Sequence, residues 1–384
     1  MTVPEEFSRF PDHWDVLPFS KAVKDATSGN TKVQKGDYLE SGSIPVVDQG
    51  QSLYGGYTNE QSAICKSELP TIVFGDHTRA FKFIEERFVL GADGAKVLEP
   101  LAKLDKRFLF HYLKQLRIES AGYSRHFKFL KETYVPVPPL SEQKRIAAIL
   151  DKADALRRKR QQAIDLANKF LRSVFLDMFG DPVTNPKGWP TKPLSQMASV
   201  VTGYPFKSAD YVDESAESVR LCRGANVLPG TLDWKDARFW PQEHLVGLEE
   251  YLIEQDDIVL AMDRPWISSG LKVCSVDVIE VPIYLVQRVA RIRARNQAMQ
   301  DLIYASIDSV AFARHCCPTE TTIPHISPVE LKAYPIFEVP SSLLECFSQV
   351  SRTTKRKIKL FEHAERESAE LFASLSQKAF SGQL

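Results

Sequence analysis

The sequence lacks the glycine-rich and nucleophile motifs that mark many enzyme sites. It contains no Gly-x-Gly, so neither a dinucleotide fingerprint nor a methyl-donor glycine loop is evident. A Walker A run and the Gly-x-Ser-x-Gly elbow of serine hydrolases are also missing. Pro11-Asp12 is the sole Pro-Asp pair, and no acidic-x-Lys follows it closely to complete a common nuclease metal site. These absences favour binding over catalysis, with an enzyme that has an unrecognised site as the alternative.

The sequence also lacks net charge, a cysteine framework and long apolar runs. Its formal net charge is zero, so any DNA-binding surface must be local. The six cysteines show no Cys-x-x-Cys spacing, which indicates reduced thiols rather than disulfides or a metal centre. No stretch approaches about 18 apolar residues, and the acidic start lacks the apolar core of a signal peptide. We therefore expect a cytoplasmic protein with no membrane contact, no metal and no cofactor.

What the chain does contain is the same arrangement twice, about 200 residues apart. Trp14 and Trp189 each open a segment that runs through strand-like sequence to a proline-rich stop, and a long charged helix follows each stop. Self-similarity at so long a period indicates two whole domains rather than a solenoid. The predicted boundaries are a first domain at 1–139, a helix at 140–180, a linker and second domain at 181–339, and a second helix at 340–384.

The two helices can be aligned with each other, Ile146 with Phe347 and Phe179 with Phe380. A heptad stripe runs along each, which predicts a coiled-coil seam on rods of about 55 Å. Because a whole domain separates the rods in the chain, they most simply pair antiparallel, with a pseudo-two-fold axis. The alternative is two surface helices, each packed on its own domain. Ser342 and Glu345 predict a capping box at the start of the second helix.

The predicted fold class is α+β, with two similar mixed α/β domains joined by two long helices that form an antiparallel coiled coil. Apolar or alternating runs bounded by turn residues predict short strands, and Phe108 to Leu116 predicts one amphipathic helix. The expected strands are 44–47, 69–74 and 81–89 in the first domain and 258–261, 273–278 and 283–289 in the second.

Basic and polar residues in the turns of both domains are candidates for contacts with DNA, because Arg, Lys, Asn, Thr and His supply hydrogen bonds to base edges and phosphates. Arg288 to Arg295 alternate at period two, which predicts a solvated strand face instead. The candidate DNA-binding residues are His77, Arg79, Arg125, His126, Lys128, Arg223, Asn226, Arg264, Thr321, Thr322 and His325.

A second basic signal lies near the middle of each long helix. In an antiparallel pair these runs would meet, and their charges would repel one another unless something acidic faced them. DNA phosphates or an acidic partner protein would fit, and the alternative is shielding by nearby acids such as Asp154 and Glu365. The candidate residues are Arg157, Arg158, Lys159 and Arg160 in the first helix and Lys355 and Arg356 in the second.

Several segments resemble one family. Pro138-Pro139-Leu140-Ser141-Glu142-Gln143-Lys144-Arg145-Ile146-Ala147 is similar to the start of the helical conserved region of type I restriction–modification specificity subunits. The close of each helix, 175–181 and 378–384, is similar as well. Segments 72–79 and 122–128 resemble parts of that family's target recognition domains. The second helix departs from the pattern, with Ser-Ser-Leu-Leu-Glu at 341–345 in place of Pro-Leu-x-Glu-Gln.

The resemblance implies a non-catalytic subunit in which each recognition domain reads one half of a bipartite, asymmetric target in double-stranded DNA. The helices would set the spacing and dock two methyltransferase subunits, and two restriction–translocase subunits would join them for cleavage. A coiled-coil adaptor protein is a further alternative, but it leaves the two loop-rich domains without a purpose.

Overall fold

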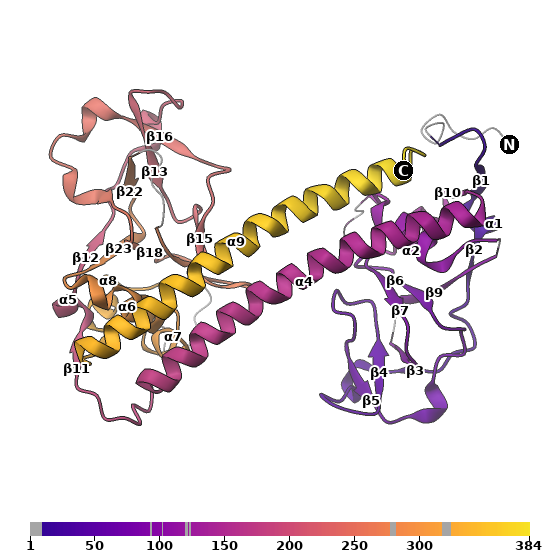
Figure 1. Cartoon of the computed structure of the whole chain (residues 1–384), viewed down its shortest axis with the longest axis horizontal. Coiled ribbons are helices and arrows are strands. Elements are labelled where there is room, and N and C mark those ends of the chain that lie inside the picture. The colour runs from indigo at the N-terminus through magenta and orange to yellow at the C-terminus, as the bar shows by residue number, and fades with distance from the viewer. Residues whose placement is uncertain are drawn as a thin grey trace. The chain divides into compact units, whose positions relative to one another are not determined.

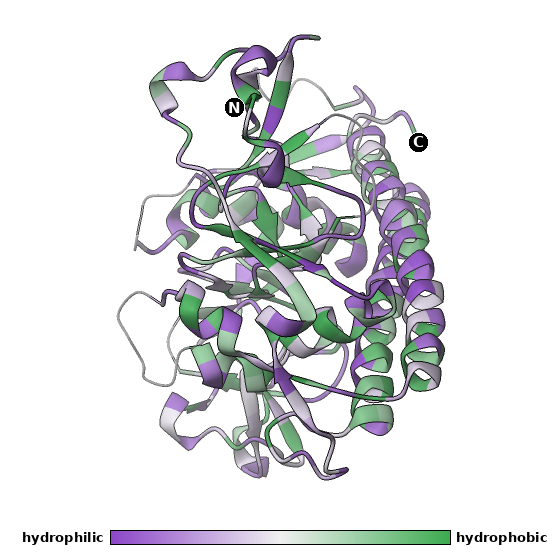
Figure 2. Ribbon diagram, turned by 90° about the vertical axis from the view of Figure 1, so that its left-hand side faces the viewer, coloured by the Kyte–Doolittle hydropathy of each residue, from purple (hydrophilic) through white to green (hydrophobic). Residues whose placement is uncertain are grey.

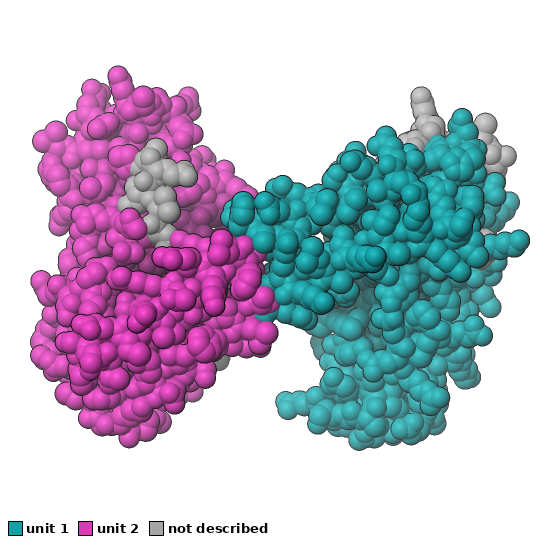
Figure 3. All heavy atoms as spheres, viewed as in Figure 1, with its two compact units in different colours: residues 1–162, 362–384 teal, residues 163–361 magenta. Residues whose placement is uncertain are grey.

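The computed structural model describes residues 10–92, 94–101, 103–119, 122, 124–276, 282–316 and 324–384. The chain divides into two compact units (Figure 3). Unit 1 consists of Met1–Gln162 with Glu362–Leu384, and unit 2 is Ala163–Phe361. Two long helices, α4 (Leu140–Phe179) and α9 (Ser341–Ala379), each contribute one end to each unit (Figure 1).

Unit 1 contains two four-stranded sheets and a two-stranded ribbon, with short helices packed against them. The first sheet has the order β2-β9-β6-β7 and the second the order β3-β8-β4-β5, while β1 pairs with β10. The bounds are β1 (Asp15–Pro18), α1 (Phe19–Ala22), β2 (Val23–Asp25), β3 (Lys32–Val33), β4 (Ile44–Val47), β5 (Gly56–Thr58), β6 (Thr71–Gly75), β7 (Phe81–Ile84), β8 (Val89–Gly91), β9 (Ala95–Pro100), α2 (Lys106–Gln115), α3 (Phe127–Lys131) and β10 (Tyr134–Val137).

Unit 2 also contains two four-stranded sheets and the equivalent ribbon. The sheets have the orders β12-β23-β18-β21 and β16-β13-β22-β17, and β11 pairs with β24. The bounds are β11 (Thr191–Pro193), α5 (Leu194–Met197), β12 (Ala198–Thr202), β13 (Ser218–Cys222), β14 (Val227–Leu228), β15 (Thr231–Leu232), β16 (Arg238–Pro241), β17 (Leu252–Ile253), β18 (Ile258–Ala261), β19 (Trp266–Ile267), β20 (Gly270–Leu271), β21 (Val273–Ser275), β22 (Ile283–Leu285), β23 (Val289–Ala294), α6 (Gln300–Ile307), α7 (Val310–Cys316), α8 (Pro328–Ala333) and β24 (Pro335–Phe337).

The strand pairings of the two units match one another. β4 pairs parallel with β8 as β13 does with β22, and β4 pairs antiparallel with β5 as β13 does with β16. Isolated bridges complete the match: Ile64 pairs antiparallel with Val89 where β17 pairs with β22, and Tyr204 pairs parallel with Val286 where β3 pairs with β8. The duplication seen in the sequence therefore extends to the internal topology of each unit.

Two predicted strands are each divided in the structure. The run 81–89 forms β7 in one sheet and β8 in the other, and the run 283–289 supplies β22 and the start of β23. An apolar run shows that strand sequence is present, but it does not show where the chain changes sheets. The helix predicted at Phe108 to Leu116 is confirmed as α2, whose N-cap Asp105 accepts hydrogen bonds from the backbone of Arg107 and Phe108.

Each unit has a hydrophobic core that includes the start of one long helix and the end of the other. In unit 1, Ile146 and Leu150 of α4 share a core with Ala379 and with Phe380, which follows α9. In unit 2, Phe175 and Phe179 of α4 share a core with Leu344 and Phe347 of α9. Phe179 packs against Phe347 with ring centroids 5.2 Å apart. Within each unit the two helix segments therefore run antiparallel.

The predicted heptad stripe is only partly buried. Ile146 and Phe347 are buried, but Leu156 and Phe170 of α4 and Leu371 of α9 are exposed. A straight α-helix drifts by about 20° per heptad, so a strict seven-residue stripe does not stay on one face over such lengths. Hydrophilic and hydrophobic residues alternate along both long helices (Figure 2).

The starts of the helices differ in one detail from the prediction. α9 begins at Ser341, so Ser342 lies inside the helix and is not its N-cap. The carbonyl of Pro340 accepts hydrogen bonds from Leu343 and Leu344 instead. None of the helices in the described part of the chain combines the length and the apolar composition needed to cross a membrane.

Candidate nucleic-acid interface

A turn and a loop meet at the end of β6 in unit 1, and we refer to residues 76–79 and 124–128 as the first turn cluster. Asp76 is buried, and its backbone carbonyl accepts a hydrogen bond from the backbone of His126 (N–O 2.9 Å). Its carboxylate accepts a second from the backbone of Phe127 (2.7 Å). Arg79 has a positive φ of 61°, and its Nη1 donates to the carbonyl of Ile118 (2.9 Å). The turn and the loop are therefore held together mainly through Asp76.

The second turn cluster, residues 262–264, 288 and 324–326, lies at the end of β18 in unit 2. The backbone of Ile326 donates to Met262 (2.8 Å), and that of Arg264 donates to Pro324 (3.1 Å). The exposed carboxylate of Asp263 contacts His325 Nδ1 at 2.6 Å and Arg288 Nε at 3.5 Å.

The backbone of the second turn cluster is unusual at two arginines. Arg264 and Arg288 have positive φ values of 45° and 73°, a conformation that is uncommon for residues other than glycine. Such outliers persist only where the surrounding structure determines them, and they concentrate at functional sites.

The two clusters occupy equivalent places but offer different chemistry. β6 and β18 hold the same position in their sheets, and each cluster joins its strand end to the loop before a short helix, α3 or α8. In the first cluster the carboxylate, Asp76, is buried and bonded to the backbone. In the second cluster the carboxylate, Asp263, is exposed between two basic side chains. The hydrogen-bonding groups presented to solvent therefore differ between the units.

Most of the described DNA-binding candidates belong to these clusters. Arg79, Arg125 and Lys128 in the first cluster and Arg264 and His325 in the second are exposed, and His77 is half-buried. Thr321 and Thr322 lie outside the described residues.

Two candidates have structural roles instead. His126 is 1% exposed, and its Nδ1 lies 3.0 Å from the carbonyl oxygen of Asp76. Asn226 is also 1% exposed; its side chain donates to Asp233 and accepts from the backbone of Arg223. Both side chains face the interior because they satisfy buried backbone groups of a turn, so the structure contradicts their selection as DNA contacts. Arg223 is half-buried and forms an ion pair with Asp236 (2.7 Å).

The basic run of α4 has an acidic partner within unit 1. Asp154 is buried and contacts Arg157 (3.0 Å), Arg158 (3.3 Å) and Lys114 of α2 (3.8 Å). Burial alone would raise the pKa of Asp154, but these three cations hold it below its ordinary value. Arg160 donates to the backbone of Ala364 and the hydroxyl of Ser368 in α9. Lys159 remains exposed.

The basic run of α9 has a different acidic partner, Asp301 of α6. Its carboxylate is buried and accepts hydrogen bonds from Ser348, Ser351 and Lys355, each at 2.8 Å. Burial would raise the pKa of Asp301, but Lys355 and the two hydroxyls lower it. Arg356 is exposed. Much of the basic charge is therefore neutralised inside each unit, and Asp301 was not among the acids considered from the sequence.

The arginines of β23 do not form the predicted solvated face. Arg291 is buried and donates to the carbonyl of Leu252 (3.1 Å). Arg293 contacts the buried carboxylate of Asp257 through two nitrogens, at 2.7 and 2.8 Å. Alternation at period two gives the face of a strand but not whether solvent or a second sheet covers that face.

Sequence reasoning missed two features of the interface. Arg288 was assigned to the strand face, but its positive φ and its contact with Asp263 place it in the second turn cluster. Loop 48–53 of unit 1 was not selected because it carries no basic residue. The structure brings this loop against the first turn cluster, where Gln49 accepts hydrogen bonds from the backbone of His77 (3.2 Å) and the hydroxyl of Thr78.

Comparison with known proteins shows which proteins the chain resembles. A family model described as the type I restriction modification DNA specificity domain matches residues 20–166. The chain is 24% identical over 308 residues to the type I restriction enzyme MjaVIII specificity subunit of Methanocaldococcus jannaschii, covering 74% of this chain and 71% of that protein. It is 27% identical over 238 residues to the EcoAI specificity subunit of Escherichia coli, covering 57% of this chain and 40% of that protein.

A solved structure shares the fold. The S subunit of a type I restriction–modification system from M. genitalium superposes with a TM-score of 0.61 at 14% sequence identity, covering 99% of this chain and 98% of that one. The shared fold and the sequence matches point to the same group of proteins, the DNA specificity subunits of type I systems. Residues 20–166 therefore match the type I restriction modification DNA specificity domain, and over most of its length the chain is similar to a specificity subunit of these systems.

Proposed function

We propose that this chain reads a bipartite, asymmetric sequence in double-stranded DNA, one half with each recognition domain. The first domain would comprise residues 1–139 and the second, with its linker, 181–339; 140–180 and 340–384 would be spacer helices. The observation that carries the proposal is that matched strand pairings end in equivalent turn clusters with different chemistry. Equivalent surfaces with different donors and acceptors are what two different half-sites require.

The two long helices would act together as one antiparallel coiled coil that fixes the spacing of the half-sites. Support comes from each unit, where the start of one helix shares a core with the end of the other. α4 has 40 residues, which corresponds to about 60 Å. One turn of DNA is about 34 Å, so such a ruler could hold two readers a helical turn or more apart. The arrangement would be pseudo-two-fold.

The helices would also dock two methyltransferase subunits, with two restriction–translocase subunits joining for cleavage. Large exposed apolar side chains on both helices support this role, because exposed apolar surface is what a docked partner would cover. They are Leu156, Leu166, Phe170 and Leu176 of α4 and Leu360 and Leu371 of α9. Lys159 and Arg356, both exposed, would face a partner or phosphates.

The test is a binding selection on random DNA with the chain assembled with its methyltransferase subunits. We expect one split sequence with two different halves. Replacing residues 1–139 with the corresponding domain of another specificity subunit should change one half only. A change in both halves, or in neither, would contradict the modular assignment.

A second experiment tests docking. Leu166→Glu combined with Phe170→Glu should weaken methyltransferase binding by at least roughly tenfold, because charge replaces apolar contact area. Glu370→Ala, at an exposed position of α9, is the matched control and should bind normally. If the double variant binds as well as the control, these side chains do not form the docking surface.

A further inference from the structure

Loop 48–53 is the first part of the connection between β4 and β5 in unit 1, and three of its residues, Gln51, Ser52 and Leu53, are exposed. It has no basic side chain, so it does not supply a phosphate contact by charge. Its position is nevertheless fixed by two independent sets of contacts.

The first set is a buried cation beneath the loop. The side chain of Lys82 is 4% exposed, and its Nζ donates to the carbonyl of Asp48 (2.8 Å) and lies 3.5 Å from the Asp48 carboxylate. Burial lowers the pKa of Lys82, while Asp48 opposes that effect. Asp48 in turn accepts a hydrogen bond from the backbone of Gly50 (2.8 Å). Burying an ammonium group is costly unless it is paired, so this pair holds the loop base in one position.

The second set joins the loop to the first turn cluster. The side-chain oxygen of Gln49 accepts a hydrogen bond from the backbone N–H of His77. The backbone carbonyl of Gln49 accepts another from the hydroxyl of Thr78. Gly75 and Gly94 permit this approach, since a Cβ on either would collide with Gln49. The loop and the turn therefore form one preorganised surface.

Gln51 is the residue of this loop whose amide side chain is available to a ligand. Its Nε2 donates to the carbonyl of Thr78 at 3.4 Å, a long and therefore weak hydrogen bond. Gln49, in contrast, is committed to His77. A carboxamide donates and accepts at once, which matches the N7 acceptor and N6 donor of adenine in the major groove.

We propose that loop 48–53 is a base-reading loop of the first domain and that Gln51 reads adenine in its half-site. The inference rests on the proposed function, since it presumes that this domain reads one half of the target. Preorganisation supports it, because a specific contact loses less free energy when the loop is already ordered.

The equivalent loop of unit 2 supports the same assignment. β4 and β13 hold equivalent places, and the loop after β13 begins with Arg223, which Asp236 positions. Arginine favours guanine, whereas glutamine favours adenine. The same loop in the two domains would therefore contribute to the asymmetry of the target.

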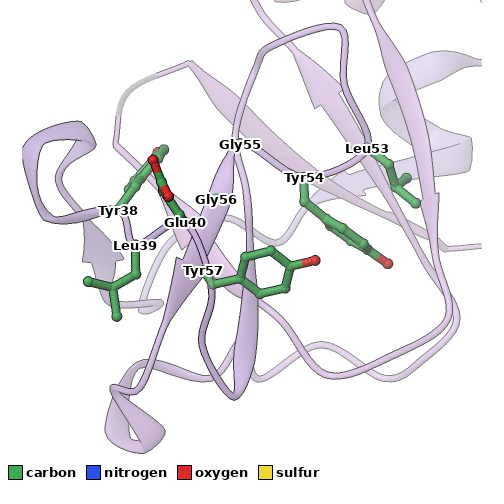
Figure 4. A pocket seen from close by; sticks show the side chains of 8 residues that line it. All are labelled: Tyr38, Leu39, Glu40, Leu53, Tyr54, Gly55, Gly56 and Tyr57. Atoms are coloured by element: carbon green, nitrogen blue, oxygen red, sulfur yellow. The ribbon is translucent and has the colours of Figure 1, made fainter. Parts of the chain in front are cut away.

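A neighbouring pocket limits where DNA can lie. It has a volume of about 610 Å³ and is lined by Leu53 and by the rings of Tyr38, Tyr54 and Tyr57. In Figure 4, Tyr38 and Glu40 lie on one side of the pocket and Leu53 and Tyr54 lie on the other, with Tyr57 between the two groups. With a carboxylate and no basic residue in its lining, the pocket disfavours phosphate, so the DNA backbone should pass on the side of the turn cluster.

The test measures binding of the complex with methyltransferase to duplexes carrying each base pair at every position of the selected target. Gln51→Ala should remove discrimination of about 5- to 150-fold at a single A·T pair in the half-site of the first domain. Ser52→Ala, at the exposed neighbouring position, is the matched control and should leave discrimination unchanged. Lys82→Met should loosen the loop and reduce discrimination at the same pair without changing the other half-site.

The outcomes are separable. Unchanged discrimination in Gln51→Ala, a uniform loss across all sequences, or an effect in the other half-site would overturn the role of Gln51 and leave the proposed function standing. If the unmodified chain selects no split sequence, the proposed function fails, and this inference fails with it.

Discussion

Unit 1 and unit 2 anchor the starts of their long helices with opposite charge. In unit 1 the acids are on the long helix: Asp151 and Asp154 of α4 contact His111 (2.8 Å) and Lys114 (3.8 Å) of α2. The base is on the domain and the acid on the helix.

In unit 2 the signs are reversed. Asp301 belongs to the domain helix α6, and Lys355 and Arg352 of α9 contact it at 2.8 and 4.0 Å. When the long helices are aligned as in the sequence, Asp154 corresponds to Lys355 and Asp151 to Arg352. The ion pairs that hold the long helices, which we call the anchors, therefore occupy equivalent positions in the two units, but the acid and the base have changed places.

This reversal gives each domain a preference for its own helix. If α4 started on the domain of unit 2, Asp154 would face Asp301, and like charges in a partly buried site are strongly unfavourable. Repulsion against the wrong pairing adds to attraction for the right one. A duplicated chain needs such a device because its two halves otherwise present similar surfaces to the same helices.

The largest expected effect comes from the helix ends that close each core. Phe380 packs on Tyr112 and Phe108 in unit 1, and Phe179 packs on Phe175 and Phe347 in unit 2. Phe380→Ala and Phe179→Ala should each lower the free energy of unfolding by about 3–5 kcal/mol, measured by urea denaturation.

Hydrogen exchange should separate the two variants. Phe380→Ala should expose the amides of α2, and Phe179→Ala those of α6. Phe170→Ala, at a site 52% exposed, should change stability by no more than about 0.5 kcal/mol. Loss of protection in α6 upon substitution of Phe380 would show that the cores are not closed as described.

Removing the two anchor acids should have unequal effects. Asp301→Ala leaves Lys355 beside two buried serines without its acceptor and should cost about 3 kcal/mol. Asp154→Ala should cost about 1 kcal/mol, because its arginine partners are 38% and 64% exposed. Chemical denaturation of both variants checks the order, and equal losses would show that the greater exposure of the arginine partners of Asp154 does not matter.

Reversing the polarity of the unit 2 anchor tests the comparison directly. Asp301→Lys and Lys355→Asp should each destabilise the chain, because each places like charges together. The double variant imitates unit 1 and should recover about 1–2 kcal/mol relative to the sum of the single effects. A coupling energy near zero in this double-mutant cycle would mean that the charges do not recognise each other.

The long helices and the duplication could be predicted from the sequence because both leave repeating signals. α4 spans Leu140–Phe179, within one residue of the predicted 140–180, and Gly180 follows it with φ of 85°. The charge-reversed anchors could not be predicted. Asp301 and Lys355 are far apart in the chain, and their contact depends on how α6 packs on α9.

In the candidate site, too, features that are local in the sequence could be predicted, whereas contacts between distant residues could not. Turn residues such as Arg79 and Arg264 were found because basic residues beside turn signals are visible locally. His126 and Asn226 were misassigned because a sequence does not show whether a polar side chain satisfies a buried backbone group. Loop 48–53 was missed because its importance comes from Lys82, which is buried beneath it.

The smallest expected difference between the anchors is in their response to pH. His111 is buried and contacts Asp151, and its Nδ1 has no hydrogen-bond partner among the described residues. Burial lowers the pKa of His111, with Lys114 acting in the same direction and Asp151 and Asp154 opposing. As the pH falls, His111 therefore takes up a proton near pH 6.5 in the unfolded chain, but only at a lower pH in the folded chain.

The contribution of His111 to stability is thus complete above pH 6.5 and declines below it, by at most about 1.4 kcal/mol per pH unit. The lowered pKa of Asp301 makes its contribution persist until the pH falls below about 3.8. Between pH 7 and 5, hydrogen exchange should therefore accelerate in α2 before α6. His111→Gln, which cannot take up the proton, should remove this difference; if α2 still loosens first in that variant, another group in unit 1 is responsible.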